Sequence, residues 1–273
     1  MSQDAIDPYP WFLHKEIPLV INHLPGTMHI TSKEWTDSWR PFLGRLVDLR
    51  KSPEQRLVVG IVGPPGSGKS FLAEQIAWLA SRGCIPGAMA IALPMDGFHH
   101  NREYLESHHQ RLSSGDSITL QECKGSPFTY DVVSLRQHLQ QLREVPPIMT
   151  WPGYDRQIHD VVPEEHRIPA AVNLVLVEGN YLFLDRAPFK GIGEFFDLKI
   201  YVEAPAPSIM GNLMERHILG GRSMEAAKDW VKRVDLPNAR LVEATRSVVD
   251  VVVQRDQQDR MSAVIWKNQA VGA

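Results

Sequence analysis

The chain has 273 residues, a mass of 30.8 kDa and a formal net charge of −3, with 43% hydrophobic and 22% charged residues. This composition is typical of a globular protein with one large or two small domains. Because no run of Lys or Arg is longer than two residues, the basic surface of a nucleic-acid or membrane binder is not indicated. The sequence therefore favours a small-molecule ligand, with no nucleic-acid and no membrane partner.

The cysteines and the N-terminal residues indicate in which cellular compartment the protein is expected. Cys84 and Cys123 are far apart, and their spacing fits neither a disulfide framework nor a zinc site. The first ten residues hold acidic residues and prolines where a signal peptide needs a basic and then an apolar stretch, and no apolar run reaches membrane-spanning length. We therefore expect a cytoplasmic protein.

Residues 1–55 differ in pattern from the rest, with tryptophans scattered among prolines. Thr31 and Glu34 have the spacing of a capping box at a helix N-terminus. The apolar residues that follow lie on one helical face: Trp35, Trp39, Phe42, Leu43 and Leu46. We interpret this region as an N-terminal helical appendage packed on the core. Tryptophans exposed on it would favour a homodimer.

Residues 56–273 alternate short apolar runs with helix-length amphipathic segments. Strands are predicted at 57–62, 88–94, 147–151, 174–177, 198–202 and 248–253. Helices are predicted from Ser70 to Gly83, around residues 135–142, and at 209–219 and 224–234. The alternation predicts an α/β fold, a doubly wound parallel sheet with helices on both faces.

A phosphate-binding loop follows the first of these strands. Residues 63–70 read GPPGSGKS and match G-x-x-x-x-G-K-[ST] between a buried strand and a helix, as in P-loop NTPases. Glycines let the backbone approach phosphate oxygens, and the N–H groups with the helix end hold negative charge. We expect Lys69 to reach the β- and γ-phosphates of ATP and Ser70 to bind Mg²⁺. The predicted nucleotide-binding residues are Gly63, Pro65, Gly66, Ser67, Gly68, Lys69, Ser70 and Phe71.

Two carboxylates follow apolar runs, where ligands of open α/β sheets bind. Asp96 comes after the run 88–94, and an ionised Asp there can orient a substrate hydroxyl and accept its proton during phosphoryl transfer. A helix cap or a ligand of magnesium alone is the alternative. Glu178 ends the run 174–177, the place of a Walker-B carboxylate, and is predicted to serve the metal directly or through water. A purely structural role is its alternative.

These motifs resemble the family that unites uridine kinase, bacterial pantothenate kinase and phosphoribulokinase, over roughly residues 57–254. The resemblance rests on the loop GPPGSGKS, on PMDGF at 94–98, on KGSPFTYD at 124–131, on 154–161 and on EGNYL at 178–182. It is strongest to a pantothenate-kinase-like, fructose-transport-kinase-like bacterial branch, through PMDGFHH and PNARLV. The resemblance implies that Asp96 is the catalytic base.

The resemblance also implies an acceptor-binding segment and a lid. Tyr154, Arg156 and His159 are expected to bind the acceptor, although a surface turn would also explain them. Phe128 and Asp131 are weaker candidates, since Asp131 would cap the next helix equally well. Arg216 and Arg222, beside Gly220-Gly221, fall in a lid at about 214–224 that closes over ATP, with surface salt bridges as the alternative.

Together these residues predict a Mg²⁺-ATP kinase in which Asp96 and Lys69 are catalytic and Ser70 and Glu178 serve the metal. The acceptor is a sugar or sugar-like polyol, a nucleoside or a pantothenate-like acid, with a sugar slightly favoured. One rival is an ATPase switch that acts with a protein partner. A nucleotide-binding module without catalysis is a second rival, which the complete set of four residues argues against. The adjacent pairs His99-His100 and His108-His109 do not suggest a metal site.

Overall fold

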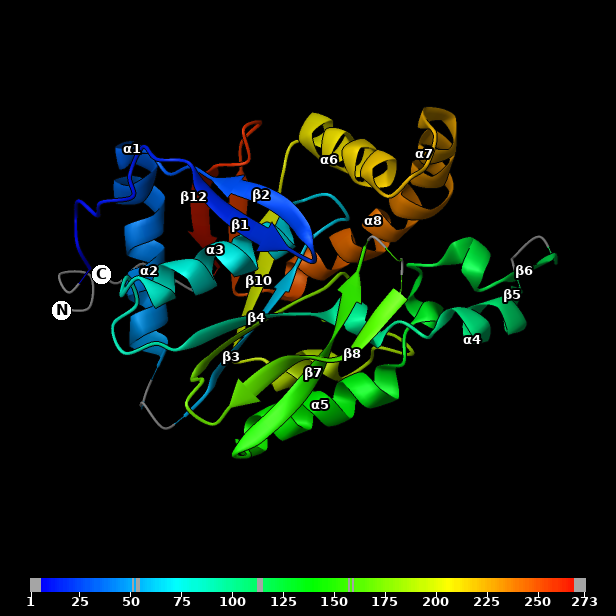
Figure 1. Ribbon diagram of the computed structural model, residues 1–273, viewed down its shortest axis with the longest axis horizontal. Coiled ribbons are helices and arrows are strands. Elements are labelled where there is room, and N and C mark those ends of the chain that lie inside the picture. Colours follow the sequence, from blue (N-terminus) through cyan, green and yellow to red (C-terminus); the bar gives the residue numbers. More distant parts are fainter. Residues whose placement is uncertain are drawn as a thin grey trace.

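A six-stranded sheet forms the centre of the computed structural model, which describes residues 6–50, 52, 55–111, 115–156, 158 and 160–267 (Figure 1). All neighbouring strands are parallel except the last pair, β11 and β12, which is antiparallel. The strand order across the sheet is β12 (Met261–Trp266), β11 (Val251–Arg255), β10 (Leu198–Glu203), β3 (Leu57–Val62), β9 (Leu174–Glu178) and β4 (Ala90–Pro94). The predicted doubly wound α/β fold is therefore confirmed.

Helices cover both faces of this sheet. The remaining helices and strands are β1 (Ile17–Ile21), β2 (Leu24–Met28), α1 (Ser32–Glu34), α2 (Arg40–Leu49), α3 (Lys69–Ser81), α4 (Arg102–Ser107), β5 (His109–Arg111), β6 (Ser117–Thr119), α5 (Val132–Glu144), β7 (Ile148–Asp155), β8 (Asp160–Pro169), α6 (Ala206–Leu219), α7 (Met224–Trp230) and α8 (Leu236–Glu243). Short 3-10 or π-helical turns lie at Trp35–Trp39, Met95–Phe98, Gln121–Cys123, Pro127–Thr129, Ile192–Phe195, Val231–Asp235 and Ala244–Val248.

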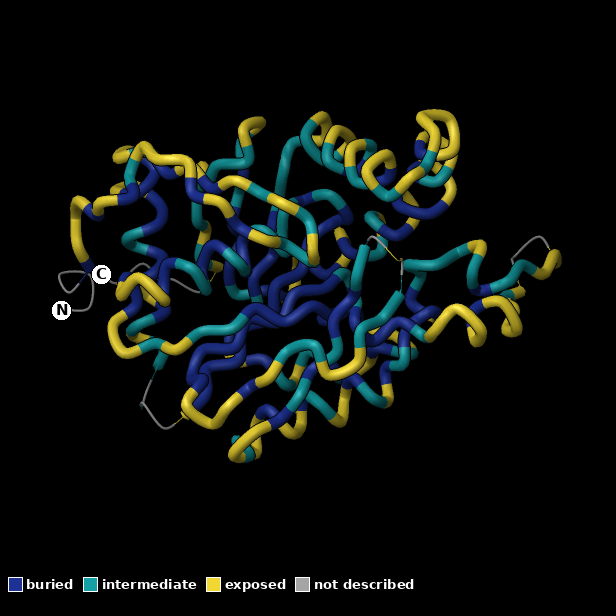
Figure 2. The backbone as a smooth tube through the Cα atoms, in the orientation of Figure 1, coloured by how far each residue is buried: buried dark blue, intermediate teal, exposed yellow. Residues whose placement is uncertain are grey.

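Alternate residues of each strand face opposite layers, as the two-residue period of a strand requires. In β3, Val59 and Ile61 join a cluster with α2 and α3, whereas Val58 and Val62 join a second cluster with α5. The central strands are buried along their length and the helices carry the exposed surface (Figure 2). Burial on both faces explains why these strands read as continuous apolar runs in the sequence.

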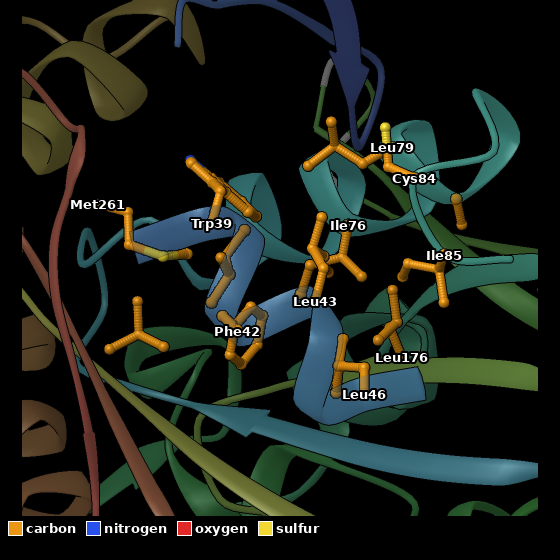
Figure 3. Packing of buried hydrophobic residues seen from close by; sticks show 14 of the residues in the cluster. Trp39, Phe42, Leu43, Leu46, Ile76, Leu79, Cys84, Ile85, Leu176 and Met261 are labelled. Carbon is orange, nitrogen blue, oxygen red and sulfur yellow. The ribbon is translucent and has the colours of Figure 1, made fainter. Parts of the chain in front are cut away.

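The predicted N-terminal helix forms as expected and packs into the core. The Thr31 hydroxyl accepts a hydrogen bond from the Glu34 N–H, which is the predicted cap. The Glu34 carboxylate accepts from Trp39 Nε1 and from the Met261 N–H of β12, both at 2.9 Å, so the helix is tied to the sheet edge. Trp35 and Trp39 are fully buried and Phe42, Leu43 and Leu46 pack beside α3 (Figure 3). The division of the chain at residue 55 stays a prediction.

Three parts of the chain differ from the sequence-based expectation. The run at 147–151 lies outside the parallel sheet: it belongs to β7, which pairs antiparallel with β8. Over most of its length, buried residues alternate with half-buried ones, the pattern of a half-covered ribbon. The strand predicted at 248–253 begins only at Val251, because Ala244–Val248 forms a helical turn. The β1–β2 hairpin precedes the N-terminal helix and was not predicted. Within the described ranges, no helix combines the length and apolar character needed to cross a membrane.

Candidate active site

The phosphate-binding loop connects β3 to α3 with the backbone shape that its glycines predict. Gly66 and Gly68 have φ of 82° and 84°, which an L side chain rarely adopts. A Cβ on Gly63 would lie 2.7 Å from the Val202 carbonyl oxygen, so this position has no room for a side chain. The Ser67 hydroxyl is buried and has no hydrogen-bond partner among the described residues. The loop is thus an open cradle of N–H groups with one unused hydroxyl.

A cavity of about 680 Å³ opens beside this loop. Its floor is formed by five of the predicted nucleotide-binding residues, Gly66, Gly68, Lys69, Ser70 and Phe71. Its walls include the β1–β2 hairpin, from Ile21 to Thr27, and residues 258–260 between β11 and β12. The Arg255 guanidinium carbon lies 4.9 Å from the Phe71 ring centroid and its Nη1 donates to the Gly68 carbonyl, which fixes the loop from the sheet side. The cavity has the place and the size for a nucleotide.

Glu178 is buried and Lys69 is half-buried at the end of the loop. Burial lowers the pKa of Lys69, and the charges of Glu178 and Asp96 oppose that shift. Burial raises the pKa of Glu178, against the attraction of Lys69 and a hydrogen bond from Ser70. The two opposite charges therefore stabilise each other. Ser70 and Glu178 together place two side-chain oxygen groups at the end of the loop, and their role as metal ligands stays a prediction.

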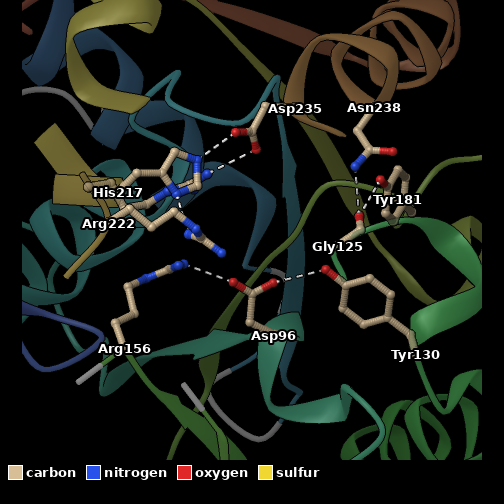
Figure 4. Close-up of polar contacts among 10 residues, drawn as sticks. Asp96, Gly125, Tyr130, Arg156, Tyr181, His217, Arg222, Asp235 and Asn238 are labelled. Atoms are coloured by element: carbon tan, nitrogen blue, oxygen red, sulfur yellow. Dashed lines mark hydrogen bonds and ion pairs between the residues drawn. The ribbon is translucent and has the colours of Figure 1, made fainter. Parts of the chain in front are cut away.

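Asp96 lies in the helical turn that follows β4, with both carboxylate oxygens engaged (Figure 4). Oδ2 accepts from Arg156 Nη2 at 2.8 Å, and Oδ1 accepts from the Tyr130 hydroxyl at 3.2 Å. Burial raises the pKa of Asp96, but Arg156, His99 and Lys69 outweigh it and hold that pKa well below its usual range. Asp96 is thus an oriented carboxylate that stays ionised.

A second cavity, of about 230 Å³, lies on the other side of Asp96. Of the predicted acceptor-binding residues, Tyr154 and Arg156 line it, together with Pro65 of the phosphate-binding loop. His99 also lines it and stacks on Tyr130 with ring centroids 3.9 Å apart. Burial lowers the pKa of His99 to about 4, despite the opposing charge of Asp96, so His99 is neutral at pH 7.

The predicted lid residues meet the site through a buried carboxylate. Asp235 Oδ1 accepts from Arg216 Nη2 at 3.2 Å, and Asp235 Oδ2 contacts His217 Nε2 at 2.6 Å (Figure 4). Arg222 Nη1 lies 2.7 Å from His217 Nδ1. Because arginine can only donate, Nδ1 accepts and the His217 proton sits on Nε2, facing Asp235. Arg222 also lies over the Trp230 ring, 4.2 Å from its centroid. Both predicted arginines are therefore held in place.

Arg156 and Arg216 line both cavities, so their guanidinium groups mark the boundary between them. A phosphoryl group passing from one cavity to the other would meet these two cations and Lys69. Guanidinium groups in this position stabilise charge on a transferred phosphoryl group. The structure thus brings together the predicted residues of the two cavities and Glu178. Gly63 and Ser67 support the loop, Phe128 and Asp131 do not line either cavity, and His159 lies outside the described residues.

Several residues of the site were not predicted from the sequence. Tyr130, Lys124, His217 and Asp235 all line the second cavity. Lys124 and Tyr130 stand inside KGSPFTYD, so that motif was a usable signal, whereas nothing local marks Asp235. Phe128 is exposed and Asp131 accepts from the Ser134 N–H as the N-cap of α5. Asp131 therefore fills its alternative, capping role.

The residues of the site fit a metal ion that is bound together with phosphate groups of a nucleotide. Among the described residues, no group of three or more His, Cys, Asp or Glu side chains could hold a metal ion. Ser70 and Glu178 supply oxygen atoms of the kind that Mg²⁺ prefers, and Mg²⁺ commonly binds through one or two protein ligands plus substrate phosphates. The residues present therefore fit Mg²⁺ bound as a nucleotide complex.

Comparison with known proteins agrees with this geometry. The sequence model of the Phosphoribulokinase / Uridine kinase family matches residues 58–262. An uncharacterised protein of Escherichia coli K12, YggC, is 34% identical over 247 residues, which cover 90% of this chain and 98% of the relative. Pantothenate kinase of Lacticaseibacillus casei BL23 is 25% identical over 202 residues, covering 74% and 62%. The crystal structure of a Silicibacter sp. TM1040 protein, named provisionally as a fructose transport system kinase, is similar with a TM-score of 0.62 at 29% identity, covering 74% and 94%.

Proposed function

The chain belongs to the phosphoribulokinase/uridine kinase family, and from that premise we propose that it transfers the γ-phosphate of ATP to a hydroxyl group of a small metabolite, with Asp96 as the base. The family is one of ATP-dependent P-loop kinases. The observation that carries the proposal is the position of Asp96 beside the second cavity, with Arg156 and Arg216 lining both cavities. A nucleotide in one and an acceptor in the other would meet at these residues.

In the proposed reaction, each residue of the site has one role. Lys69 and the loop N–H groups hold the ATP phosphates, and Asp96 orients the acceptor hydroxyl. The hydroxyl oxygen attacks the γ-phosphorus, the bond between that phosphorus and the β,γ-bridging oxygen breaks, and the hydroxyl proton passes to Asp96. A carboxylate with a lowered pKa is a weak base, but orientation matters more than base strength in a loose phosphoryl-transfer transition state. Arg156 and Arg216 stabilise the charge on the transferred group.

Mg²⁺ would be held by Ser70 and Glu178 together with the nucleotide phosphates. It would neutralise phosphate charge when bound. The acceptor is a sugar or sugar-like polyol, a nucleoside or a pantothenate-like acid, classes that the names of relatives also suggest. A lid at 214–224 would close over ATP, with Gly220-Gly221 as its hinge and Arg216 and Arg222 as its cations.

The test is ADP release from Mg-ATP across a panel of sugars, sugar acids, nucleosides and pantothenate, for the wild type and for Asp96→Asn. We expect one acceptor to raise ADP release well above the rate without acceptor. The Asn variant should lose that rise by about 10²- to 10⁴-fold while it binds ATP normally. ADP release that no acceptor changes would instead indicate an ATPase switch that acts with a protein partner.

A further inference from the structure

Three residues line both cavities: Leu24, Arg156 and Arg216. The two arginines offer cations to a phosphoryl group that passes between the cavities. Leu24 is half-buried and carries only an apolar side chain, so this side chain forms no hydrogen bond with either ligand. An apolar group at this boundary serves instead to keep water away from the γ-phosphate.

Water at the boundary would compete with the acceptor for the same phosphoryl group. Asp96 would orient a water molecule as well as an acceptor hydroxyl, and the water oxygen would attack the γ-phosphorus. The bond between that phosphorus and the β,γ-bridging oxygen would break, one water proton would pass to Asp96, and ADP and inorganic phosphate would leave. A segment that covers the reacting groups prevents this loss of ATP.

Leu24 is carried by the β1–β2 hairpin, whose base is anchored in the core. Ile17, Leu19 and Met28 are buried in the apolar cluster that also contains residues of α3. Phe71, in the first turn of α3, packs against the same cluster and lines the nucleotide cavity. The hairpin therefore stands on the helix that follows the phosphate-binding loop.

The tip of this hairpin is held by a contact with a second hairpin. His23 lies in the turn between β1 and β2, and its Nε2 is 2.7 Å from Oε1 of Glu165 on β8. Figure 1 shows the tip of the β1–β2 hairpin beside the β7–β8 hairpin. Because Leu24 directly follows His23, this contact fixes the position of the residue that lines both cavities.

Glu165 is in turn fixed by the neighbouring strand. Its second carboxylate oxygen, Oε2, is buried and has no hydrogen-bond partner within the described residues. A Cβ on Gly153 of β7 would overlap this oxygen, so the carboxylate fills the space that the glycine leaves. The contact between His23 and Glu165 therefore joins the two hairpins that bring Leu24 and Arg156 to the boundary.

We propose that the β1–β2 hairpin determines whether the γ-phosphate passes to the acceptor or to water. Leu24 is the specificity-determining residue, because its side chain excludes water from the boundary between the cavities. His23 and Glu165 are positioning residues that act through Leu24. This inference rests on the proposed kinase function and concerns its selectivity for the acceptor over water.

The first experiment measures the release of inorganic phosphate by the full chain at saturating Mg-ATP, without any acceptor. Leu24→Ala removes most of the apolar side chain, and we expect it to raise phosphate release about tenfold or more. Leu24→Met, which keeps the apolar volume, should behave as the wild type. The control is Val20→Ala, since Val20 is 69% exposed on the same hairpin and does not line the cavity. Unchanged phosphate release in Leu24→Ala would overturn the inference.

Variants of the contact between the hairpins test the positioning role. His23→Ala and Glu165→Gln should each raise phosphate release, and the double variant should raise it no further than either single one, because both act through one contact. Glu164→Gln, the same change at the exposed neighbour, is the matched control and should have no effect. A lower Tm of the single variants without more phosphate release would indicate a structural role only and would overturn the positioning role.

A last measurement separates this inference from the proposed function. The acceptor that raises ADP release most in the panel is added, and ADP, phosphorylated acceptor and inorganic phosphate are all measured. We expect the wild type to form about one phosphorylated acceptor per ADP, as a kinase does, and Leu24→Ala to divert ATP to inorganic phosphate. Full transfer to the acceptor in Leu24→Ala would overturn this inference and leave the kinase function intact. No stimulation of the wild type by any acceptor would overturn both.

Discussion

The Arg156 guanidinium lies against the Asp96 carboxylate, with Nη2 2.8 Å from Oδ2. The contact joins the β7–β8 hairpin to the turn after β4, two segments that are 60 positions apart in the chain. Tyr130 occupies the other carboxylate oxygen. In the free protein, therefore, the proposed base is ionised and oriented, and each carboxylate oxygen keeps a second lone pair that can accept from an acceptor hydroxyl.

This contact predicts a shift in the acid limb of the pH profile when Arg156 is replaced by Met. The carboxylate is the active form, so activity falls as the pH drops through the pKa of Asp96. Arg156 is the largest influence that lowers this pKa, and burial raises it, so the pKa of Asp96 rises when Arg156 is removed. We expect the acid limb of kcat/KM to lie at a higher pH in the variant than in the wild type.

The control is Arg240→Met, at an exposed position of α8. Its pH profile should match the wild type. The measurement is kcat/KM against pH, which reports the groups of the free enzyme. An unchanged acid limb in Arg156→Met would show that Asp96 does not act as the base.

Glu74 makes the folded protein less stable as the pH rises, whereas a carboxylate with a lowered pKa makes it more stable. Burial, with a smaller effect from the charge of Glu178, raises the pKa of Glu74 to about 7. Between its ordinary pKa of about 4.3 and 7, the folded protein keeps a proton that the unfolded chain releases. The free energy of unfolding therefore falls as the pH rises through this window.

We expect Glu74→Gln to remove this loss, worth about 2 kcal/mol between pH 5 and pH 8. Urea unfolding of the variant and the wild type at both pH values measures it. Glu103→Gln, at an exposed position of α4, is the matched control and should follow the wild type. If the Glu74→Gln variant loses as much stability as the wild type on going to pH 8, the buried proton is not on Glu74.

Asp235 ties the predicted lid to the site, and its replacement by Asn should be costly. Arg216 and His217 both bond to this buried carboxylate, and loss of one partner in a buried charged cluster costs about 3 kcal/mol. Asp229→Asn removes an exposed pair with Arg233 at 2.7 Å, worth below about 0.5 kcal/mol. Urea unfolding at constant m-value compares the two variants. Equal, small losses would mean that the cluster does not hold the lid helices together.

Local signals explain why the phosphate-binding loop, Asp96 and Glu178 could be predicted from the sequence. Each lies at the carboxyl end of a strand of the central sheet, and the edge where parallel strands end is fixed by the fold class. The central strands could also be predicted from the sequence, because burial on both faces makes them continuous apolar runs. The cap at Thr31 depends on residues three positions apart and was equally readable.

Contacts between distant segments could not be predicted in this way. Asp235 meets Arg216 only because the chain turns back after α6, and no spacing encodes that turn. The run at 147–151 has the length of a buried strand, and a short apolar run does not say which sheet it joins. The β1–β2 hairpin did carry a signal: buried Ile17 and Leu19 alternate with exposed residues, and Asn22 and His23 take the positive φ of a tight turn.

Gly97 lies in the helical turn that follows β4, and its φ is not positive. A glycine is required here because there is no room for a side chain. A Cβ would lie 2.1 Å from the Pro152 carbonyl oxygen and 2.9 Å from the Gly153 nitrogen of β7. Both are backbone atoms, so the turn that carries Asp96 and the hairpin that carries Arg156 would have to separate.

We therefore expect Gly97→Ala to destabilise the fold by about 2 kcal/mol and to lower kcat by about 10²-fold, because a displacement near 1 Å of a catalytic group has that effect. Gly211→Ala is the matched control, since a Cβ there meets nothing within 4 Å and the residue lies inside α6. That change should raise stability by about 0.5–1 kcal/mol and leave kcat unchanged. Urea unfolding and ADP release on both variants separate the two effects. A Gly97→Ala protein with normal kcat would show that the spacing between Asp96 and Arg156 is not needed for phosphoryl transfer.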